Sequence, residues 1–480
     1  MKKQLIGLML SAALVVGSII PVNAQAAATV DTVSVKNSIS GCVISAKDNV
    51  LYTAHFDKAP SSDDGMLYLF ELKTYEYSLP DLAEPIASVA SDKEIAINFP
   101  LNYTGGYGRL YNKFVLAAKR GGKWVLINNA QYINNPEALA TNSKPRVQRP
   151  VKALQENNVA NIFLDGINTP GEYHISTLHA VFSNNSPDVL TAKQNIGGDA
   201  HPVKNNPLAG YMLCSSDDTA ISALIMEMTN YATHSDIQDF VIGNEVNQRC
   251  WNYMNWTDWD SYVREYTQAF RICYTAIKSV NANAYVYTSL DQVWDKNPTG
   301  AQSYEYIDGK DFLQKFNTLI VENGNIDYNM SIHPYPNPLY YAKFWDLSGV
   351  ANGATYKSQV AKGQVITFQN MSVLTNTLCQ PEYLDRIGRV RDVIIGEIGM
   401  GTNAGVEAQA AGICASYAAM EMNPYVTQYL YLEYDINGFY PTLKGKGLEA
   451  FNAMGTLNEQ TYMDWAKSYI GISDWSEVIH

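Results

Sequence analysis

The chain is poor in charge and has no basic stripe. Only 17% of its 480 residues are charged, and the formal net charge is −13. Nucleic-acid-binding surfaces need lysine and arginine gathered on one face, so we expect no nucleic-acid partner. After residue 20 the sequence also has no apolar run long enough for a membrane-spanning helix.

Several signatures of other chemistries are absent. The sequence has no G-x-S-x-G elbow, no P-loop and no H-E-x-x-H motif. Their absence disfavours serine hydrolases of the α/β type, nucleotide-dependent enzymes and zinc proteases. The six cysteines include no C-x-x-C pair, and we predict neither a metal nor a cofactor.

The cysteines do not suggest a dense disulfide framework. Cys273 and Cys414 lie in helical patterns, and the others are far apart in the sequence. Buried free thiols are one interpretation. A single bridge, for example between Cys214 and Cys250, is the other, because an exported chain would meet oxidising conditions.

The first residues have the pattern of a secretory signal. Lys2 and Lys3 precede an apolar run from 5 to 20, and small residues at 22–24 and 24–26 offer cleavage sites. We predict a signal peptide at 1–26 and a secreted, extracellular protein with no membrane association after cleavage. An uncleaved anchor helix is the alternative.

Residues 29–140 have an all-β pattern. Strands are predicted at 66–72, 94–99, 114–118 and 123–127. Gly121 and Gly122 predict a hairpin turn between the last two strands. We expect a β-sandwich-like accessory domain. Its role could be structural or glycan-binding, because no catalytic constellation is visible in it.

A different pattern follows a polar, proline-bearing stretch at 134–150. Strands predicted at 240–243, 284–289, 328–333, 393–396 and 428–432 are each followed by a helical segment, and the first of these helices is predicted at 259–280. Alternation of this kind predicts a parallel sheet. Numbered from the end, these are strands four to eight of a (β/α)₈ TIM barrel over 150–480. Strands one to three are predicted at 159–164, 180–182 and 211–213.

Polar residues end most of these strands. They are Asn244 and Glu245, then Asp291, then His333 and Tyr335, then Glu397, and finally Glu433, Tyr434 and Asp435. In a TIM barrel the strand ends form the active face. Two carboxyl groups facing each other there can cleave a glycosidic bond, one as the acid and one as the nucleophile.

The motifs at these strand ends resemble a known group. GNEVN at 243–247, SLD at 289–291, HPYP at 333–336 and GEIG at 396–399 resemble the clan A glycoside hydrolases. They are most similar to a bacterial family of unassigned function that is described as glycosidase-like, over about residues 150–450.

The resemblance implies a role for each matching residue. Glu245 would be the acid/base and Glu397 the nucleophile of a retaining hydrolase acting on an oligo- or polysaccharide. Asn244 would bind the sugar 2-hydroxyl, and Tyr335 or His333 would hold Glu397. Where clan members often have a tryptophan ending strand eight, this chain has Tyr434.

Other residues and interpretations stay open. Asp291 and Trp294 could line the substrate site, or Asp291 could bond loop backbone and Trp294 could be core, as could Trp251, Trp256, Trp259 and Trp345. Glu245 could cap a loop, Glu397 could pair with Arg391, and His333 could be structural. An inactive carbohydrate-binding protein on the same barrel is the main alternative function. A surface adhesion protein is a second, although no anchor motif supports it. The sequence does not indicate the oligomeric state.

Overall fold

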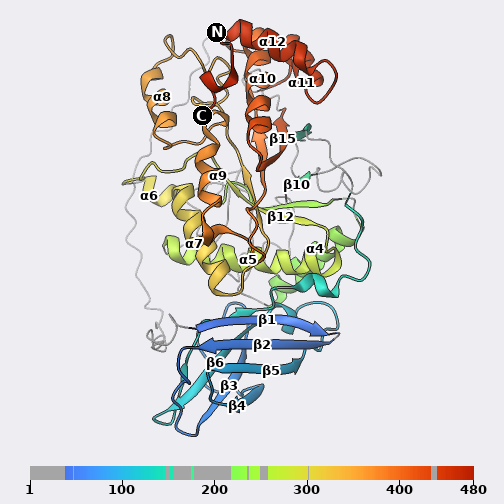
Figure 1. Ribbon diagram of the computed structural model, residues 1–480, viewed down its shortest axis with the longest axis vertical. Helices are drawn as coiled ribbons and strands as arrows, with labels where there is room; N and C mark the ends of the chain where they lie inside the picture. Colours follow the sequence, from blue (N-terminus) through green and yellow to red (C-terminus); the bar gives the residue numbers. More distant parts are fainter. Residues whose placement is uncertain are drawn as a thin grey trace, which may run out of the picture.

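The structure is a computed structural model that describes residues 38–46, 48–146, 152–155, 175–177, 218–234, 237–248, 258–300, 302–433 and 441–480. Its elements form an all-β region and an α/β region, one above the other in Figure 1. The predicted signal peptide, Cys214, Cys250, Trp251, Trp256 and Tyr434 lie outside the described residues.

The all-β region consists of two antiparallel sheets. One has the order β1-β2-β5, and the other has the order β4-β3-β6-β7 with β8 paired to β6. The strands are β1 (Ser38–Ala46), β2 (Asn49–Phe56), β3 (Met66–Leu72), β4 (Ala87–Ala90), β5 (Glu94–Pro100), β6 (Lys113–Arg120), β7 (Lys123–Leu126) and β8 (Gln131–Tyr132).

Each sheet buries one face. Exposed and buried residues alternate strictly along β5, from exposed Glu94 to buried Phe99, because successive side chains of a strand point to opposite faces. Gly121 and Gly122 have φ values of 59° and 73° and form the predicted turn between β6 and β7. The predicted sandwich-like region and its four strands are therefore observed, within one or two residues at the ends.

The α/β region contains seven parallel strands in the order β10-β11-β12-β13-β14-β15-β9. They are β9 (Lys152–Gln155), β10 (Ile175–Thr177), β11 (Asp239–Ile242), β12 (Tyr285–Leu290), β13 (Asn329–Ile332), β14 (Val393–Ile398) and β15 (Val426–Leu432). The five predicted later strands are β11 to β15. All four residues of β11 are buried, as expected for a parallel strand that is covered on both faces.

The barrel is supported in part. β9 pairs with the last strand, β15, from Tyr429↔Lys152 to Leu432↔Gln155, which is the pairing that closes a barrel. β10 pairs with β11. No ladder joins β9 to β10 among the described residues, so the closed eight-stranded barrel stays a prediction. The strands predicted at 159–164, 180–182 and 211–213 lie outside the described residues.

Helices follow the strands as the alternation predicts. They are α4 (Asp218–His234), α5 (Trp259–Val280), α6 (Gln302–Glu305), α7 (Gly309–Glu322), α8 (Gly353–Ala361), α9 (Ser372–Leu378), α10 (Val406–Met422), α11 (Lys446–Ala453) and α12 (Glu459–Ile470). The longest, α5, begins where the Asp258 carboxylate accepts a hydrogen bond from the Ser261 amide at 2.7 Å, which satisfies an otherwise orphan donor. Helices α6, α8 and α12 were not predicted.

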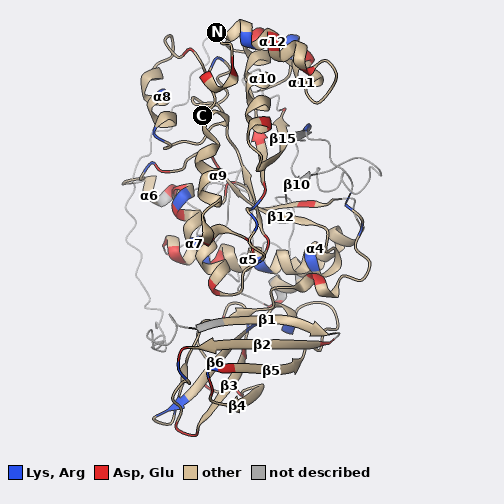
Figure 2. Cartoon of the chain, viewed as in Figure 1, with Lys and Arg blue, Asp and Glu red and all other residues tan. Residues whose placement is uncertain are grey.

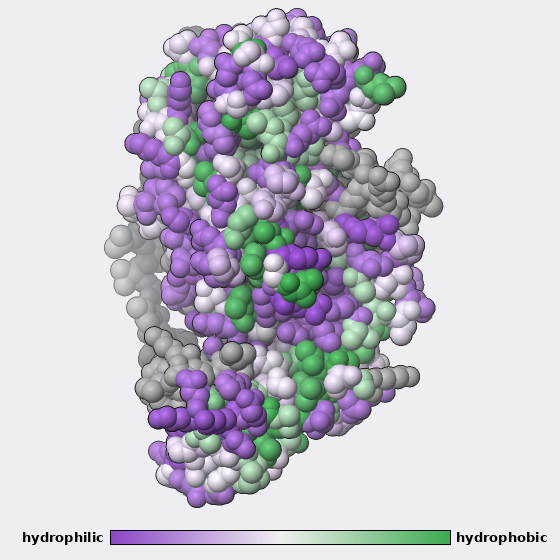
Figure 3. Space-filling view, in the orientation of Figure 1, coloured by the Kyte–Doolittle hydropathy of each residue, from purple (hydrophilic) through white to green (hydrophobic). Residues whose placement is uncertain are grey.

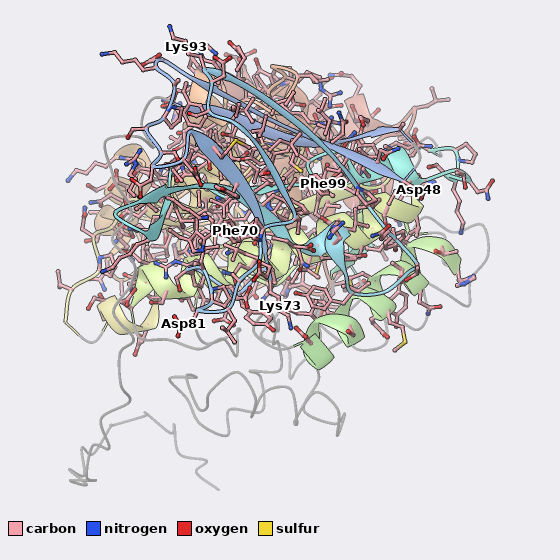
Figure 4. The ribbon with its side chains drawn as sticks, turned by 90° about the horizontal axis from the view of Figure 1, so that it is seen from below. Asp48, Phe70, Lys73, Asp81, Lys93 and Phe99 are labelled. Atoms are coloured by element: carbon pink, nitrogen blue, oxygen red, sulfur yellow. The ribbon has the colours of Figure 1, made fainter. Side chains whose placement is uncertain are left out.

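The two regions are joined through α4, α5 and α7. The Tyr132 amide donates to the Asn323 carbonyl at 2.9 Å, and the Asn323 side chain donates back to Ala130 at 2.7 Å. Lys73, labelled in Figure 4, forms an ion pair with Asp218 at the start of α4. Helix α5 crosses directly over β1 in Figure 1.

The surface is mostly hydrophilic on the face shown in Figure 3, and hydrophobic side chains reach it in small groups. Charged residues lie mainly on loops and on the outer helices, for example α7 and α12 (Figure 2). Among the described residues, no helix combines the length and apolar character that crossing a membrane requires.

Candidate active site

Glu245 occupies a strained turn directly after β11. Gly243 has a φ of 79°, and Glu245 itself has a φ of 43°. Residues other than glycine rarely adopt this left-handed conformation, and such strain often marks functional sites. The turn is held by the Glu245 amide, which donates to Ser289 Oγ at 3.3 Å, and by the Val246 amide, which donates to the Ser289 carbonyl at 2.9 Å.

Glu397 lies near the end of β14, next to a position that requires glycine. A Cβ atom at Gly396 would come within 2.0 Å of Ser331 Oγ and 3.3 Å of His333 Nε2. Glycine at 396 therefore lets β14 approach β13 closely, which brings Glu397 beside His333.

His333 lies between the two glutamates. Its Nδ1 is 2.9 Å from Glu245 Oε1 and 3.4 Å from Glu397 Oε2. The imidazole is fully buried, while both carboxylates are about five-sixths buried, with exposed side-chain fractions of 17% and 15%. One histidine thus contacts two carboxylates that come from different strands.

Tyr335 completes the contact with Glu397. Its hydroxyl donates to Glu397 Oε2 at 2.9 Å, and its ring packs edge-on against Tyr340, with centroids 5.1 Å apart. Burial raises the pKa of Tyr335 well above its usual value, and the Glu397 charge adds to the effect. The phenol therefore remains a hydrogen-bond donor throughout the neutral range.

The charge state of His333 is set by opposing effects. Burial disfavours the imidazolium, but the carboxylates of Glu397 and Glu245 outweigh burial and raise the pKa of His333 above its usual value. A charged His333 would offset part of the repulsion between the glutamates.

Asp291, directly after β12, contacts the residues that follow Glu245 in the sequence. Its carboxylate accepts hydrogen bonds from Asn247 at 2.7 Å, from Gln248 at 2.5 Å and from the Val293 amide at 2.9 Å. Burial and the nearby charge of Glu245 raise the pKa of Asp291 to about 7. Asp291 therefore bonds both side chains and loop backbone, and it fixes the residues that follow Glu245. We call Glu245, Glu397, His333, Tyr335 and Asp291 the carboxylate centre.

The remaining predicted site residues lie differently. Trp294 is only 3% exposed and belongs to the core, where Gly309 packs against its ring. A ring with so little exposure has no face available to a sugar, so its predicted stacking role is not supported. Asn244 is 7% exposed and sits beside Glu245. Tyr434 lies outside the described residues.

The interpretation that Glu397 pairs with Arg391 is not supported. Arg391 is 2% exposed, and its guanidinium donates to the carbonyls of Tyr383, Ile326 and Tyr328 and to Asn325. It is a buried structural arginine of the loops at the opposite end of β13 and β14.

Sequence reasoning missed the residues that support the centre. Ser289, Asn247 and Gln248 contact Glu245, Asp291 or His333, yet none was assigned a role. The available signal was their spacing, because Asn247 and Gln248 follow Glu245 by two and three residues and Ser289 precedes Asp291 by two.

The same side chains could also ligate a metal. One carboxylate oxygen each from Glu245 and Glu397 and one nitrogen of His333 all lie within 4.8 Å of one another. Two carboxylates and an imidazole are a donor set that first-row divalent cations accept. The same residues therefore suit either direct catalysis by the carboxylates or catalysis that depends on a bound cation.

Comparison with known proteins then places the chain in a family. A family profile described as "Family of unknown function (DUF5722)" matches residues 218–478, which is more than half of the chain. The chain belongs to this family. The matched range begins at α4 and contains the whole carboxylate centre, which agrees with the predicted resemblance to a family of unassigned function. No curated protein sequence matches the chain.

Solved structures give weak similarities. A family 39 glycoside hydrolase from the gut symbiont Bacteroides cellulosilyticus WH2 is 14% identical, with 81% of this chain and 74% of that chain covered and a TM-score of 0.32. A Bacteroides ovatus GH5 xyloglucanase is 11% identical, with 87% and 96% covered and a TM-score of 0.34. A family 1 β-glucosidase from Thermotoga maritima is 10% identical, with 61% and 77% covered and a TM-score of 0.31. Scores this low carry no argument, so a function has to be argued from the site.

Proposed function

We propose that this protein is a secreted glycoside hydrolase that cleaves a glycosidic bond with retention of configuration. Glu245 is the acid/base, Glu397 is the nucleophile, and the substrate is an oligo- or polysaccharide. The observation that carries the proposal is the approach of the two carboxylates, which have oxygens within 4.8 Å of each other.

That separation favours one stereochemical outcome. Retaining enzymes hold their carboxyl groups about 5–5.5 Å apart, whereas inverting enzymes need about 6.5–9.5 Å to admit a water molecule. A carboxylate pair this close suits direct attack on the anomeric carbon.

The neighbouring side chains suit a double displacement. The Glu245 carboxylic acid gives its proton to the glycosidic oxygen while a Glu397 oxygen forms a bond to the anomeric carbon. Tyr335 donates to Glu397 Oε2, which holds the plane of the nucleophilic carboxylate fixed. Water then releases the sugar, with Glu245 accepting the proton of that water. His333 keeps both carboxylates in place through its Nδ1.

Two other functions use the same residues. An inactive carbohydrate-binding protein would bind its sugar at the carboxylate centre, but it would not need both glutamates in contact with one histidine. A metal-dependent hydrolase would use Glu245, His333 and Glu397 as ligands. Each predicts a different response in one experiment.

The experiment measures turnover of the full mature chain on a panel of polysaccharides and aryl glycosides. Wild type is compared with Glu245→Ala, Glu397→Ala and, as a matched control, Glu449→Ala, which removes an exposed carboxylate of α11. We expect the first two changes to reduce kcat by about 10³-fold or more and the control to retain activity. Azide should restore Glu245→Ala with a retained glycosyl azide and Glu397→Ala with an inverted one.

The alternatives give distinct results. Glycan binding without turnover, unaffected by either alanine, would favour the binding protein. Activity that EDTA removes and one divalent cation restores would favour the metal-dependent reaction. Inverted product from the wild type would refute the double displacement.

A further inference from the structure

A cavity of about 250 Å³ lies between the all-β region and helices α5 and α7. Its helical wall comes from one face of α5, where Arg264, Gln268 and Arg271 are spaced four and three residues apart and so lie in a row. Lys113 of β6 contributes from the opposite side. We call this the junction cavity. It shares no lining residue with the carboxylate centre.

Lys113 is buried, and no carboxylate of the described residues lies within ion-pair distance of its ammonium group, although the charge of Glu76 acts on it from further away. It is 6% exposed, and its ammonium group donates to the Thr74 carbonyl at 3.0 Å and lies 4.4 Å from the centre of the Tyr77 ring. Burial lowers the pKa of Lys113 to about 7. A lysine held in this way gains most from an added negative charge, because an anion would offset its lost hydration.

Two arginines share the cavity wall. Arg271 is 2% exposed and donates to the carbonyls of Ile320 and Gly324, but its buried Nη1 has no hydrogen-bond partner among the described residues. Arg264 lies over the Tyr77 ring at 5.1 Å. The three cations contact backbone carbonyls and the Tyr77 ring, and none of them forms an ion pair with a carboxylate of the described residues.

The cavity walls carry a surplus of positive charge. Three cations face two carboxylates, Glu76 and Glu322. One of these, Glu76, already accepts a hydrogen bond from the Lys73 amide at 2.8 Å. A local surplus of cations contrasts with the net charge of −13 for the chain, and it points to an anionic ligand.

Part of the remaining wall is apolar, and this part favours anions that also carry an apolar group. Leu72, Val115, Leu126 and Leu319 line it. Polar side chains, among them Asn128 and Gln268, also line the cavity, but any phosphate or sulfate oxygen that faced the apolar part would lose its hydrogen bonds to water without replacement. An anion with one charged end and one apolar end matches both parts of the wall.

We propose that the junction cavity binds the carboxylate of a small organic acid, with Lys113 and Arg264 facing the carboxylate and the leucine and valine side chains covering its apolar part. Binding there would tie the all-β region to α5, because both regions supply contacts. The proposal is independent of the hydrolytic function.

The test is calorimetric titration of the full mature chain with sodium butyrate, with sodium phosphate and sodium chloride at equal ionic strength as comparison anions. Wild type is compared with Lys113→Met, which keeps the length of the side chain and removes its charge. The matched control is Lys119→Met. This residue is on the same strand, but it lies over the Tyr68 and Trp124 rings and outside the cavity.

We expect saturable butyrate binding that weakens at least tenfold in Lys113→Met and is unchanged in Lys119→Met. If Lys113→Met does not fold, Arg264→Gln, which alters an exposed side chain, should weaken butyrate binding in its place. Absence of butyrate binding to the wild type would overturn the proposal. So would equal affinity for phosphate, or butyrate affinity unaffected by both cavity variants.

Discussion

The carboxylate centre and the junction cavity treat buried charge in opposite ways. In the carboxylate centre, charges of both signs touch, because His333 contacts two glutamates within 3.4 Å. In the junction cavity the cations are separated from carboxylates and rely on backbone carbonyls and aromatic rings. Burial shifts pKa values in both places. In the carboxylate centre, the glutamates beside His333 outweigh its burial and raise its pKa, whereas in the junction cavity burial dominates and lowers the pKa of Lys113.

The difference teaches where each kind of site comes from. The carboxylate centre is made by the ends of parallel strands, which converge whatever else packs around them. The junction cavity forms where the two regions meet. No local sequence pattern marks the charged residues that line it. The two sites should also respond in opposite directions to pH.

The largest expected effect comes from removing the link between the two glutamates. His333→Ala should lower kcat/KM by about 10³-fold, because misplaced and mutually repelling carboxylates lose their reactive geometry. Steady-state kinetics on a substrate found in the panel would measure it. The matched control is His55→Ala, which removes an exposed histidine–glutamate contact of 2.5 Å to Glu94 and should retain activity.

The raised pKa of His333 also predicts how folding stability depends on pH. Because its pKa is raised in the folded protein, its stabilising contribution is complete below the unfolded value of about 6.5 and is lost as the pH rises through the folded value. The stability difference between wild type and His333→Ala should therefore be greatest at acidic pH. A difference that grows with pH would contradict the assigned charge pairing.

The junction cavity should behave in the reverse sense. The pKa of Lys113 is lowered to about 7, so between about pH 7 and 10.5 the unfolded chain binds the additional proton and stability rises with pH. Lys113→Met removes the cost of that burial. It should stabilise the protein by about 1–3 kcal/mol at pH 7, and the gain should vanish near pH 10.

Urea denaturation at several pH values would measure this gain. Lys119→Met, a more exposed lysine of the same strand, should change stability by no more than about 0.5 kcal/mol. Loss of stability in Lys113→Met at pH 7 would show that the ammonium contacts outweigh its lost hydration.

The smallest expected effect concerns Asp291. Its pKa is raised to about 7, so between about pH 4 and 7 the folded protein binds the additional proton and stability falls as pH rises. The side chain in Asp291→Asn cannot titrate. Between pH 4 and 7 the free energy of unfolding of this variant should therefore fall by about 1–2 kcal/mol less than that of the wild type. Asp260→Asn, which changes an exposed aspartate of α5, serves as the control. Parallel curves for wild type and Asp291→Asn would contradict the prediction.

Much of the fold could be predicted because its elements are local. The helical pattern predicted α5 at its observed bounds, Trp259–Val280, and the apolar runs predicted β11 to β15. Helix α12 was missed because it follows the last predicted strand–helix unit and has few buried residues. The early strands lacked periodicity, and β9 was identified only by its pairing with β15.

The carboxylate centre was predictable for a similar reason. A polar residue at the end of a buried strand stands out from its neighbours, and Glu245, His333, Tyr335 and Glu397 all do. The sequence left two positions open for Trp294, because a tryptophan in a loop can face the substrate site or pack onto the core. Here Gly309 packs against its ring.

The sequence by itself determined two patterns of apolar residues: strict alternation in β5 and continuous apolar runs in β11 and β14. The ends of those apolar runs are also the positions of the carboxylates. Periodicity is a local property, so one chain segment suffices to express it. Only the tertiary structure decided that one imidazole contacts both glutamates, and that Lys113 faces Arg264 across a cavity. Such distances depend on how separate elements pack, and no single segment encodes them.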